Sequence, residues 1–230
     1  MSNVIQATYI DHMGSDLSVV NAARVSFGKK SEWNPNWRDD HYEPLLTADS
    51  KLIKYLAKHK HISPFGHCFA SFHVKAPIFV ARQLVKHKFL RWNEISRRYV
   101  DDEPEFYTPN VWRGRSADKK QGSDPDVVID TAYYDRDDGY NTWDGDATSI
   151  AHEAYQKMIK LGVSPEMARM VLPQSTMTEF YWSGSLDAFA DMCRLRCASD
   201  TQYETRVVAD NINEKMEELF PVSWGALMDG

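Results

Sequence analysis

The chain has 230 residues, enough to bury the core of one domain without disulfides or metals. A hydrophobic fraction of 43% excludes a disordered chain, and a net charge of −6 gives no general attraction to nucleic acid or anionic membranes. The sequence shows no membrane-length apolar stretch and no visible secretory signal, so the chain is predicted to be cytoplasmic. Its three cysteines, an odd count, are predicted to be reduced, packed thiols.

The first part of the chain alternates extended and helical patterns. We predict a strand over residues 3–9 and helices over 15–27 and 47–59, with a Trp-, Asn- and Pro-containing loop over 32–40. Apolar and polar residues alternate strictly over 68–74, which predicts a half-buried strand.

The middle of the chain is less regular. Pro77 is suited to the first turn of a helix, which we predict to run to about Lys88. Residues 89–109 carry no clear pattern. In 109–146 acids outnumber Lys and Arg, and we interpret this segment as an acidic insertion with little regular structure.

Helical patterns return in the last third. They predict helices over 147–161 and 164–173, the second with Ser164 as N-cap and Pro165 in its first turn. A short strand over 178–182 precedes two further helices, the first capped by Ser185 and reaching about Cys197, the second ending near Leu219.

Taken together, the elements predict one α+β domain over residues 1–230, with several helices and a small antiparallel or mixed sheet. There is no Gly-x-Gly pair anywhere in the chain. A Rossmann fold and a P-loop are therefore not expected.

Positive charge is concentrated in residues 82–98, which hold six Lys and Arg side chains and a single acid, Glu94. Such a cluster repels itself unless an anion lies among the charges, and phosphate is the anion that Lys and Arg bind best. By helical spacing, Gln83, Lys86 and His87 share one face of the predicted helix. A solvated basic helix end accounts for the same composition, so composition alone leaves both interpretations open.

The order of residues within this cluster resembles a known family. The string KHKFLRWNEISRRY (86–99) is similar to the signature of flavin-dependent thymidylate synthases, which runs Arg-His-Arg, seven residues and then Ser. His87 lies between two lysines, and Ser96 falls in register with the signature serine. Other segments that resemble the family, in the family's order, are HISPFGH, FHVKAPIFVARQ, EFYTP, MARMVLP and LRCASDTQYE.

The resemblance implies an enzyme that methylates dUMP to dTMP. It implies 5,10-methylenetetrahydrofolate (a folate) as carbon donor, NADPH as reductant, FAD as hydride carrier, and a homotetramer with shared active sites. Arg196 would be a catalytic residue, because a fixed cation stabilises the negative charge that develops on the uracil ring. The residues implied to bind dUMP are Gln83, Lys86, Glu94, Ser96, Arg97, Arg98, Arg169 and Arg196. Those implied to contact FAD are Ser63, Lys86, His87, Lys88, Glu94, Ser185 and Asp191.

Some positions depart from the family pattern. Lys86 and Lys88 replace two arginines, and lysine lacks the planar fork that binds phosphate at two points. Gly66 replaces a common acid, and Asp200 replaces a histidine. A catalytically impaired relative that binds nucleotide and flavin therefore stays open as an alternative.

The sequence carries features of two other kinds of site. A nucleic-acid binder could use the basic cluster with Trp92 and Tyr99 for stacking, but the rest of the chain is acidic. Four histidines between residues 59 and 73 suggest a metal site, but histidines at ordinary surface and core positions account for this pattern better. The acidic run 135–146 fails the register of a calcium-binding loop. We predict neither a nucleic-acid partner nor a metal site.

Overall fold

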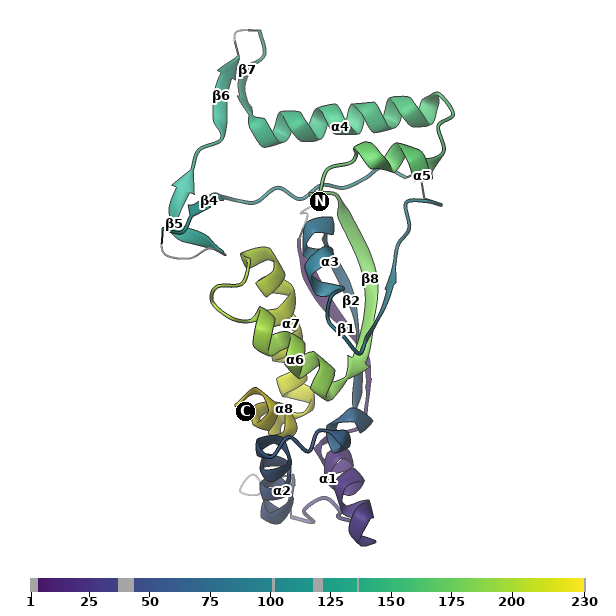
Figure 1. Cartoon of the computed structure of the whole chain (residues 1–230), viewed down its shortest axis with the longest axis vertical. Coiled ribbons are helices and arrows are strands. Elements are labelled where there is room, and N and C mark those ends of the chain that lie inside the picture. Colours follow the sequence, from purple (N-terminus) through teal and green to yellow (C-terminus); the bar gives the residue numbers. More distant parts are fainter. Residues whose placement is uncertain (1–3, 37–43, 101, 118–121, 136, 230) are drawn as a thin grey trace.

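The computed structural model describes residues 4–36, 44–100, 102–117, 122–135 and 137–229. A four-stranded antiparallel sheet forms its centre, with helices packed along it and two hairpins and a long helix at one end (Figure 1). The predicted α+β fold is therefore confirmed, and the sheet is antiparallel rather than mixed.

The sheet has the strand order β1-β2-β8-β3. The alternating segment 68–74 is confirmed as β2, and the predicted strand at 178–182 is the longer central strand β8. The strand predicted over 3–9 corresponds to β1, which continues further than expected; residue 3 lies outside the described part. The bounds are β1 (Gln6–Met13), β2 (Phe69–Pro77), β3 (Leu90–Glu94) and β8 (Met177–Ser185).

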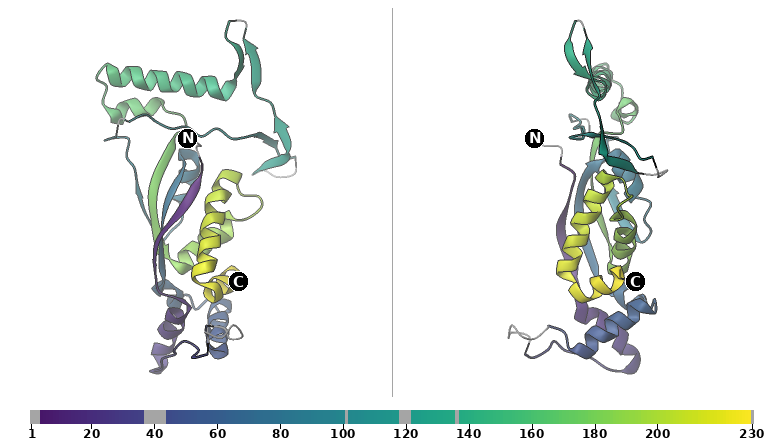
Figure 2. Two further views of the ribbon diagram at one scale, coloured as in Figure 1. Left: turned by 180° about the vertical axis from the view of Figure 1, so that it is seen from behind. Right: turned by 90° about the vertical axis from the view of Figure 1, so that its left-hand side faces the viewer.

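The alternation in β2 sorts its side chains between two faces of the sheet. Ala70, Phe72 and Val74 are buried, whereas Ser71 and His73 are only half-buried. The inner face packs against two helices that run along the sheet, as Figure 2 shows in its right-hand view. They are α6 (Leu186–Arg196) and α7 (Tyr203–Leu219), close to the ranges predicted for them.

The edge strand β3 corrects the prediction that residues 89–109 lack regular structure. Gly184 lets β3 approach β8 closely, because a Cβ at that position would run into the Leu90 side chain and lie 3.1 Å from the carbonyl oxygen of Phe89. The preceding helix is also shorter than predicted. It is α3 (Ile78–Leu84), with Pro77 as its N-cap, and it does not reach Lys88 because the chain turns toward the sheet edge.

Three helices pack together at the end of the molecule away from the hairpins (Figure 1). The carboxylate of Asp16 is buried and accepts hydrogen bonds from the amides of Val222 (3.0 Å) and Ser223 (2.8 Å), joining the first helix to the last. The last of these helices was not predicted, although its proline in the first turn is a recognised start signal. They are α1 (Asp16–Arg24), α2 (Thr47–Lys58) and α8 (Pro221–Met228).

The other end of the molecule corrects the irregular structure predicted for 109–146. Two antiparallel hairpins form there, and the helix that follows begins before residue 147 because the Thr142 hydroxyl accepts a hydrogen bond (3.2 Å) from the amide of Gly145. The elements are β4 (Trp112–Arg115), β5 (Ser123–Ile129), β6 (Ala132–Asp135), β7 (Gly139–Thr142), α4 (Trp143–Lys160) and α5 (Pro165–Ala168).

The cysteines are free thiols, as predicted. Cys68 and Cys193 are buried, and burial raises the pKa of the Cys68 thiol to about 11, so it stays protonated at neutral pH. In the part of the chain that the structure describes, no helix combines the length and apolar character needed to cross a bilayer.

Candidate functional site

Five of the predicted site residues gather where α3 and α6 end. The guanidinium of Arg196 joins the two segments: its Nε donates to His87 Nε2 (3.0 Å) and its Nη2 donates to the carbonyl oxygen of Gln83 (3.3 Å). Lys86 and Lys88 flank His87 and are exposed. We call Gln83, Lys86, His87, Lys88 and Arg196 the first half-site.

The geometry of the first half-site differs in one respect from the prediction. Because α3 ends at Leu84, Lys86 and His87 do not share a helical face with Gln83. They lie in the turn that follows, where the amide of His87 donates to the carbonyl oxygen of Leu84 (3.1 Å). Phe89 ends this turn with a φ of 65°, a left-handed conformation that is unusual for a bulky residue. Such strained turns are frequent at binding sites.

The Arg196 contact determines the charge state of the imidazole. His87 Nε2 accepts from the guanidinium, so in this arrangement the ring is neutral and carries its proton on Nδ1. Burial lowers the pKa of His87, and the charge of Arg196 lowers it further, partly offset by Asp191. The first half-site therefore presents cations from Arg196 and the two lysines beside a neutral ring.

We expect the imidazole of His87 to titrate below the usual value of 6.5. Because its pKa is lower in the folded than in the unfolded protein, the associated stability is fully present above the unfolded value and is lost as the pH falls through the folded one. NMR titration of the ring measures this directly. Arg196→Gln should raise the midpoint, while Arg115→Gln, at an exposed position in β4, should not. A wild-type midpoint at or above the usual value would contradict the assignment.

Other predicted dUMP residues follow β3. The carboxylate of Glu94 is held at both oxygens: Oε1 accepts from the Thr178 hydroxyl (2.6 Å) and Oε2 from Trp92 Nε1 (3.0 Å). Ser96 Oγ accepts from the amide of Arg98 (3.4 Å). These hydrogen bonds fix the start of the loop that carries the next two arginines.

Three arginines complete this second group. The Nη1 of Arg97 donates to the carbonyl oxygen of Asp102 (3.0 Å). Arg98 and Arg169 meet at Glu166: Arg98 Nε lies 3.6 Å from its carboxylate, and Arg169 Nε donates to its carbonyl oxygen (3.3 Å). We call Glu94, Ser96, Arg97, Arg98 and Arg169 the second half-site.

The two half-sites are distinct groups of residues that lie before β3 and at or after its end along the chain, apart from Arg169 and Arg196. The strand β3 runs from Leu90, paired with Gly184, to Glu94, paired with Phe180, so it spans roughly 13 Å at about 3.3 Å per residue. Among the described residues, no hydrogen bond or ion pair joins a member of one half-site to a member of the other. In the described chain the residues predicted to bind dUMP therefore fall into two groups without a direct polar contact between them.

The remaining predicted flavin contacts lie near the start of α6. Ser185 is its N-cap, Asp191 lies on it, and Ser63 begins the neighbouring 3₁₀ helix Ser63–His67. Asp191 pairs with Arg194 and lines a pocket of about 360 Å³. We call it the α6 pocket; of these three residues only Asp191 lines it.

Further polar residues line the α6 pocket and were missed. Lys58, Lys60 and Arg194 supply cations, and Asp187 has a buried oxygen, Oδ1, without a hydrogen-bond partner. Cations suited to a diphosphate and carboxylates suited to ribose hydroxyls fit a dinucleotide such as FAD. The alternation of Lys and His over residues 58–61 was an available signal for this basic wall.

The histidine-rich segment contains aromatic packing. The rings of His59 and Tyr55 lie 4.3 Å apart, centre to centre, with their planes tilted by 40°, and His61 lies near both rings. Within the described ranges, no three His, Cys, Asp or Glu side chains converge as metal ligands would.

The α+β fold places cationic groups at the ends of α3, β3 and α6, an arrangement suited to the phosphate of a nucleotide. Residues 8–222 match the profile of the family described as thymidylate synthase complementing protein, and the chain belongs to that family. A relative named flavin-dependent thymidylate synthase from Thermus thermophilus is 37% identical over 94% of this chain and 73% of its own length. A relative of the same name from Wolbachia pipientis is 35% identical over 96% of this chain and 72% of its own.

A solved structure is similar over the whole chain. It is the UMP/dUMP methylase PolB from Streptomyces cacaoi bound with 5-Br dUMP, with a TM-score of 0.75 and 31% identity. The match covers 99% of this chain and 96% of that one. The fold described above is therefore the fold of a known dUMP methylase.

Proposed function

We propose that the protein catalyses the reductive methylation of dUMP to dTMP, with 5,10-methylenetetrahydrofolate as carbon donor, FAD as the flavin and NADPH as reductant. The observation that carries this proposal is the Arg196 guanidinium, held by His87 and Gln83 within a family whose relatives are named for this reaction. A cytoplasmic location stays a prediction.

Each half-site has a distinct part in the proposal. Arg196 stabilises negative charge on the uracil ring. The side chain of Gln83 is held in place by Gln202, whose Oε1 accepts a hydrogen bond from Gln83 Nε2 (2.6 Å). Lys86 and the arginines of the second half-site bind the phosphate. The neutral His87 keeps Arg196 oriented without adding a proton to the site.

The α6 pocket is the proposed place for part of FAD. The residues that would hold the cofactor are Ser63, Lys86, His87, Lys88, Glu94, Ser185 and Asp191, with Asp187 added by the structure. When bound, FAD would supply the hydride-carrying chemistry. The chain's own contribution is to neutralise the diphosphate with cations and to accept hydrogen bonds at Asp187 Oδ1.

The proposal includes a homotetramer with shared active sites, as the family resemblance implies. In it the first half-site of one subunit meets the second half-site of another, so that dUMP contacts both. Support comes from their separation along β3 in one chain.

The test is an anaerobic incubation of purified protein with FAD, NADPH, methylenetetrahydrofolate and dUMP, followed by chromatography for dTMP. Formation of dTMP that stops when FAD is omitted supports the proposal. Binding of dUMP without any dTMP would instead favour the impaired relative, and the first changes to revert would be Lys86, Lys88 and Gly66.

We expect Lys86→Ala to weaken dUMP binding and turnover by about 10- to 100-fold, because a hydrogen bond to a charged group contributes about 1.5–3 kcal/mol. Isothermal titration with dUMP and steady-state kinetics measure the two effects. Lys51→Ala, at an exposed position on α2, is the matched control. Equal affinities of the two variants would show that Lys86 does not contact the nucleotide.

A further inference from the structure

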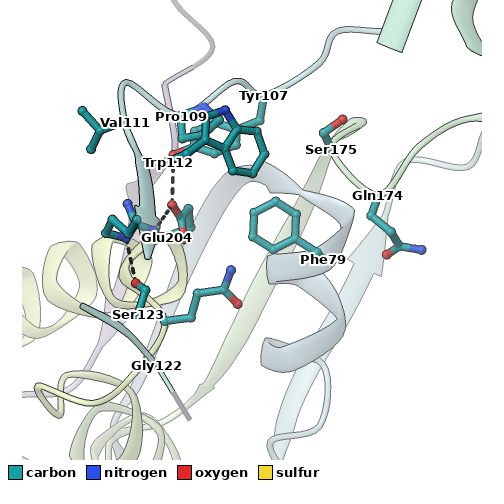
Figure 3. Close-up of a pocket in the computed structure, with 12 residues that line it drawn as sticks. Phe79, Tyr107, Pro109, Val111, Trp112, Gly122, Ser123, Gln174, Ser175 and Glu204 are labelled. Atoms are coloured by element: carbon teal, nitrogen blue, oxygen red, sulfur yellow. Dashed lines mark hydrogen bonds and ion pairs between the residues drawn. The ribbon is translucent and has the colours of Figure 1, made fainter. Parts of the chain in front are cut away.

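A second pocket lies beside the first half-site and is assigned no ligand in the function proposed above. It measures about 560 Å³, within the size range of small-molecule sites. It forms where β4 and the segment before it approach α3 and the start of α7 (Figure 3). We call it the β4 pocket.

Aromatic rings form much of its wall. Phe79 comes from α3, and Tyr107 and Trp112 come from the segment that crosses above it, with Pro109 and Val111 between them. Trp112 is 41% exposed, so its ring is only partly covered by the protein. Rings arranged around an open space suit a flat aromatic guest, which gains by stacking.

The polar end of the pocket is built on a buried carboxylate. Glu204 is 3% exposed, and its Oε1 accepts from Arg113 Nη2 (2.5 Å) and from the Tyr107 hydroxyl (3.3 Å), as the dashed lines in Figure 3 show. Its Oε2 is buried and has no partner within the described chain. A buried oxygen without a donor is costly, and Glu204 lines the pocket, so a ligand N–H that reaches this oxygen would stabilise it.

The surrounding groups keep that carboxylate oriented. Arg113 also donates to Ser123 Oγ (2.9 Å), and its guanidinium lies 4.9 Å from the centre of the Tyr203 ring. Burial and the nearby charge of Glu204 raise the pKa of Tyr107 to about 12, so its hydroxyl keeps its proton and continues to donate. Glu204 is therefore fixed before any ligand arrives.

The β4 pocket adjoins the proposed nucleotide site. Gln202 lines it and also accepts the hydrogen bond from Gln83. Phe79 lies one helical turn from Gln83 on α3. A ring bound between Phe79 and Trp112 would therefore lie close to the first half-site.

We propose that the β4 pocket binds a planar heteroaromatic ring carrying an exocyclic amino or carboxamide group, whose N–H donates to Glu204. This inference rests on the proposed function, because that reaction uses two ligands of this chemistry. One is the pterin of the folate and the other is the nicotinamide of NADPH. Glu204 accepts from the exocyclic nitrogen, and the aromatic wall holds the ring flat.

The test uses the full-length protein loaded with FAD and dUMP. Isothermal titration with 5-formyltetrahydrofolate in one arm and NADP⁺ in the other distinguishes the two sources. Trp112→Ala removes part of the wall, and Trp143→Ala, on α4 outside the pocket, is the matched control. Because one stacking partner is lost, Trp112→Ala should lower the affinity for the ligand in the pocket by about 10- to 100-fold.

A second variant fills the pocket rather than opening it. Gln174 is exposed at the rim, so Gln174→Trp adds bulk without removing a buried group. We expect the same single ligand to lose affinity in Gln174→Trp and in Trp112→Ala, with FAD content and dUMP affinity unchanged in both. The arm that responds identifies the occupant.

The pocket assignment is overturned if both ligands bind Trp112→Ala, Gln174→Trp and Trp143→Ala as tightly as wild type, or if neither ligand binds the wild-type protein. Formation of dTMP by the wild type separates the two proposals. An active enzyme with insensitive variants rejects only the pocket, whereas ligand binding that the variants weaken in a protein that forms no dTMP rejects only the reaction.

Discussion

Arg196→Ala should lower kcat/KM for dTMP formation by about 100- to 1,000-fold, the range found when a group that stabilises developing negative charge is removed. Arg196 is the only cation whose side chain bonds to both His87 and Gln83 within the described chain. Its removal takes away the charge proposed to face the uracil and also frees the imidazole. Steady-state kinetics with saturating folate and NADPH measure the effect.

Two further variants separate charge from geometry. Arg196→Lys keeps the positive charge but cannot donate from two nitrogens in a fixed plane, so we expect an intermediate activity. Arg115→Ala removes an exposed arginine from β4 and should leave kcat/KM unchanged. Activity of Arg196→Ala equal to that of Arg115→Ala would exclude a catalytic part for this guanidinium.

The regular elements could be predicted because their patterns are local. The alternation in β2 places Phe72 and Val74 inside, and helical spacing located α2, α6 and α7. The strand β3 was missed for the opposite reason. Its residues Leu90 and Trp92 do alternate with polar neighbours, but five residues give a weak signal, and the strand forms by pairing with β8, which lies far along the chain.

The candidate site shows the same limit. Motif order identified residues that the fold brings together, such as His87 and Arg196, which lie 109 positions apart. It could not reveal that α3 ends before Lys86, nor that the two half-sites share no hydrogen bond or ion pair in the described chain. Asp187 and Glu204 were missed because burial without a partner is a property of the packed protein and leaves no pattern in the sequence.

Trp182→Ala should give the largest loss of stability of any single change considered, about 3–5 kcal/mol, as expected for a large buried aromatic residue. Trp182 is 1% exposed at the centre of β8. Its ring lies 5.8 Å from that of Trp92 on β3 and 5.6 Å from that of Phe189 on α6. Removing it opens a cavity between the sheet edge and the helix that ends at Arg196.

Chemical denaturation followed by circular dichroism measures this loss, with Trp143→Ala as the control because that ring is 66% exposed. If Trp182→Ala does not fold, Trp182→Phe, which keeps an aromatic ring, should fold with a smaller loss. The ring of His87 lies 6.5 Å from that of Trp182, so Trp182→Phe should also weaken dUMP binding more than Trp143→Ala does. Equal stabilities of Trp182→Phe and Trp143→Ala would show that this aromatic cluster does not hold β3 and α6 in place, and the first half-site would then need another support.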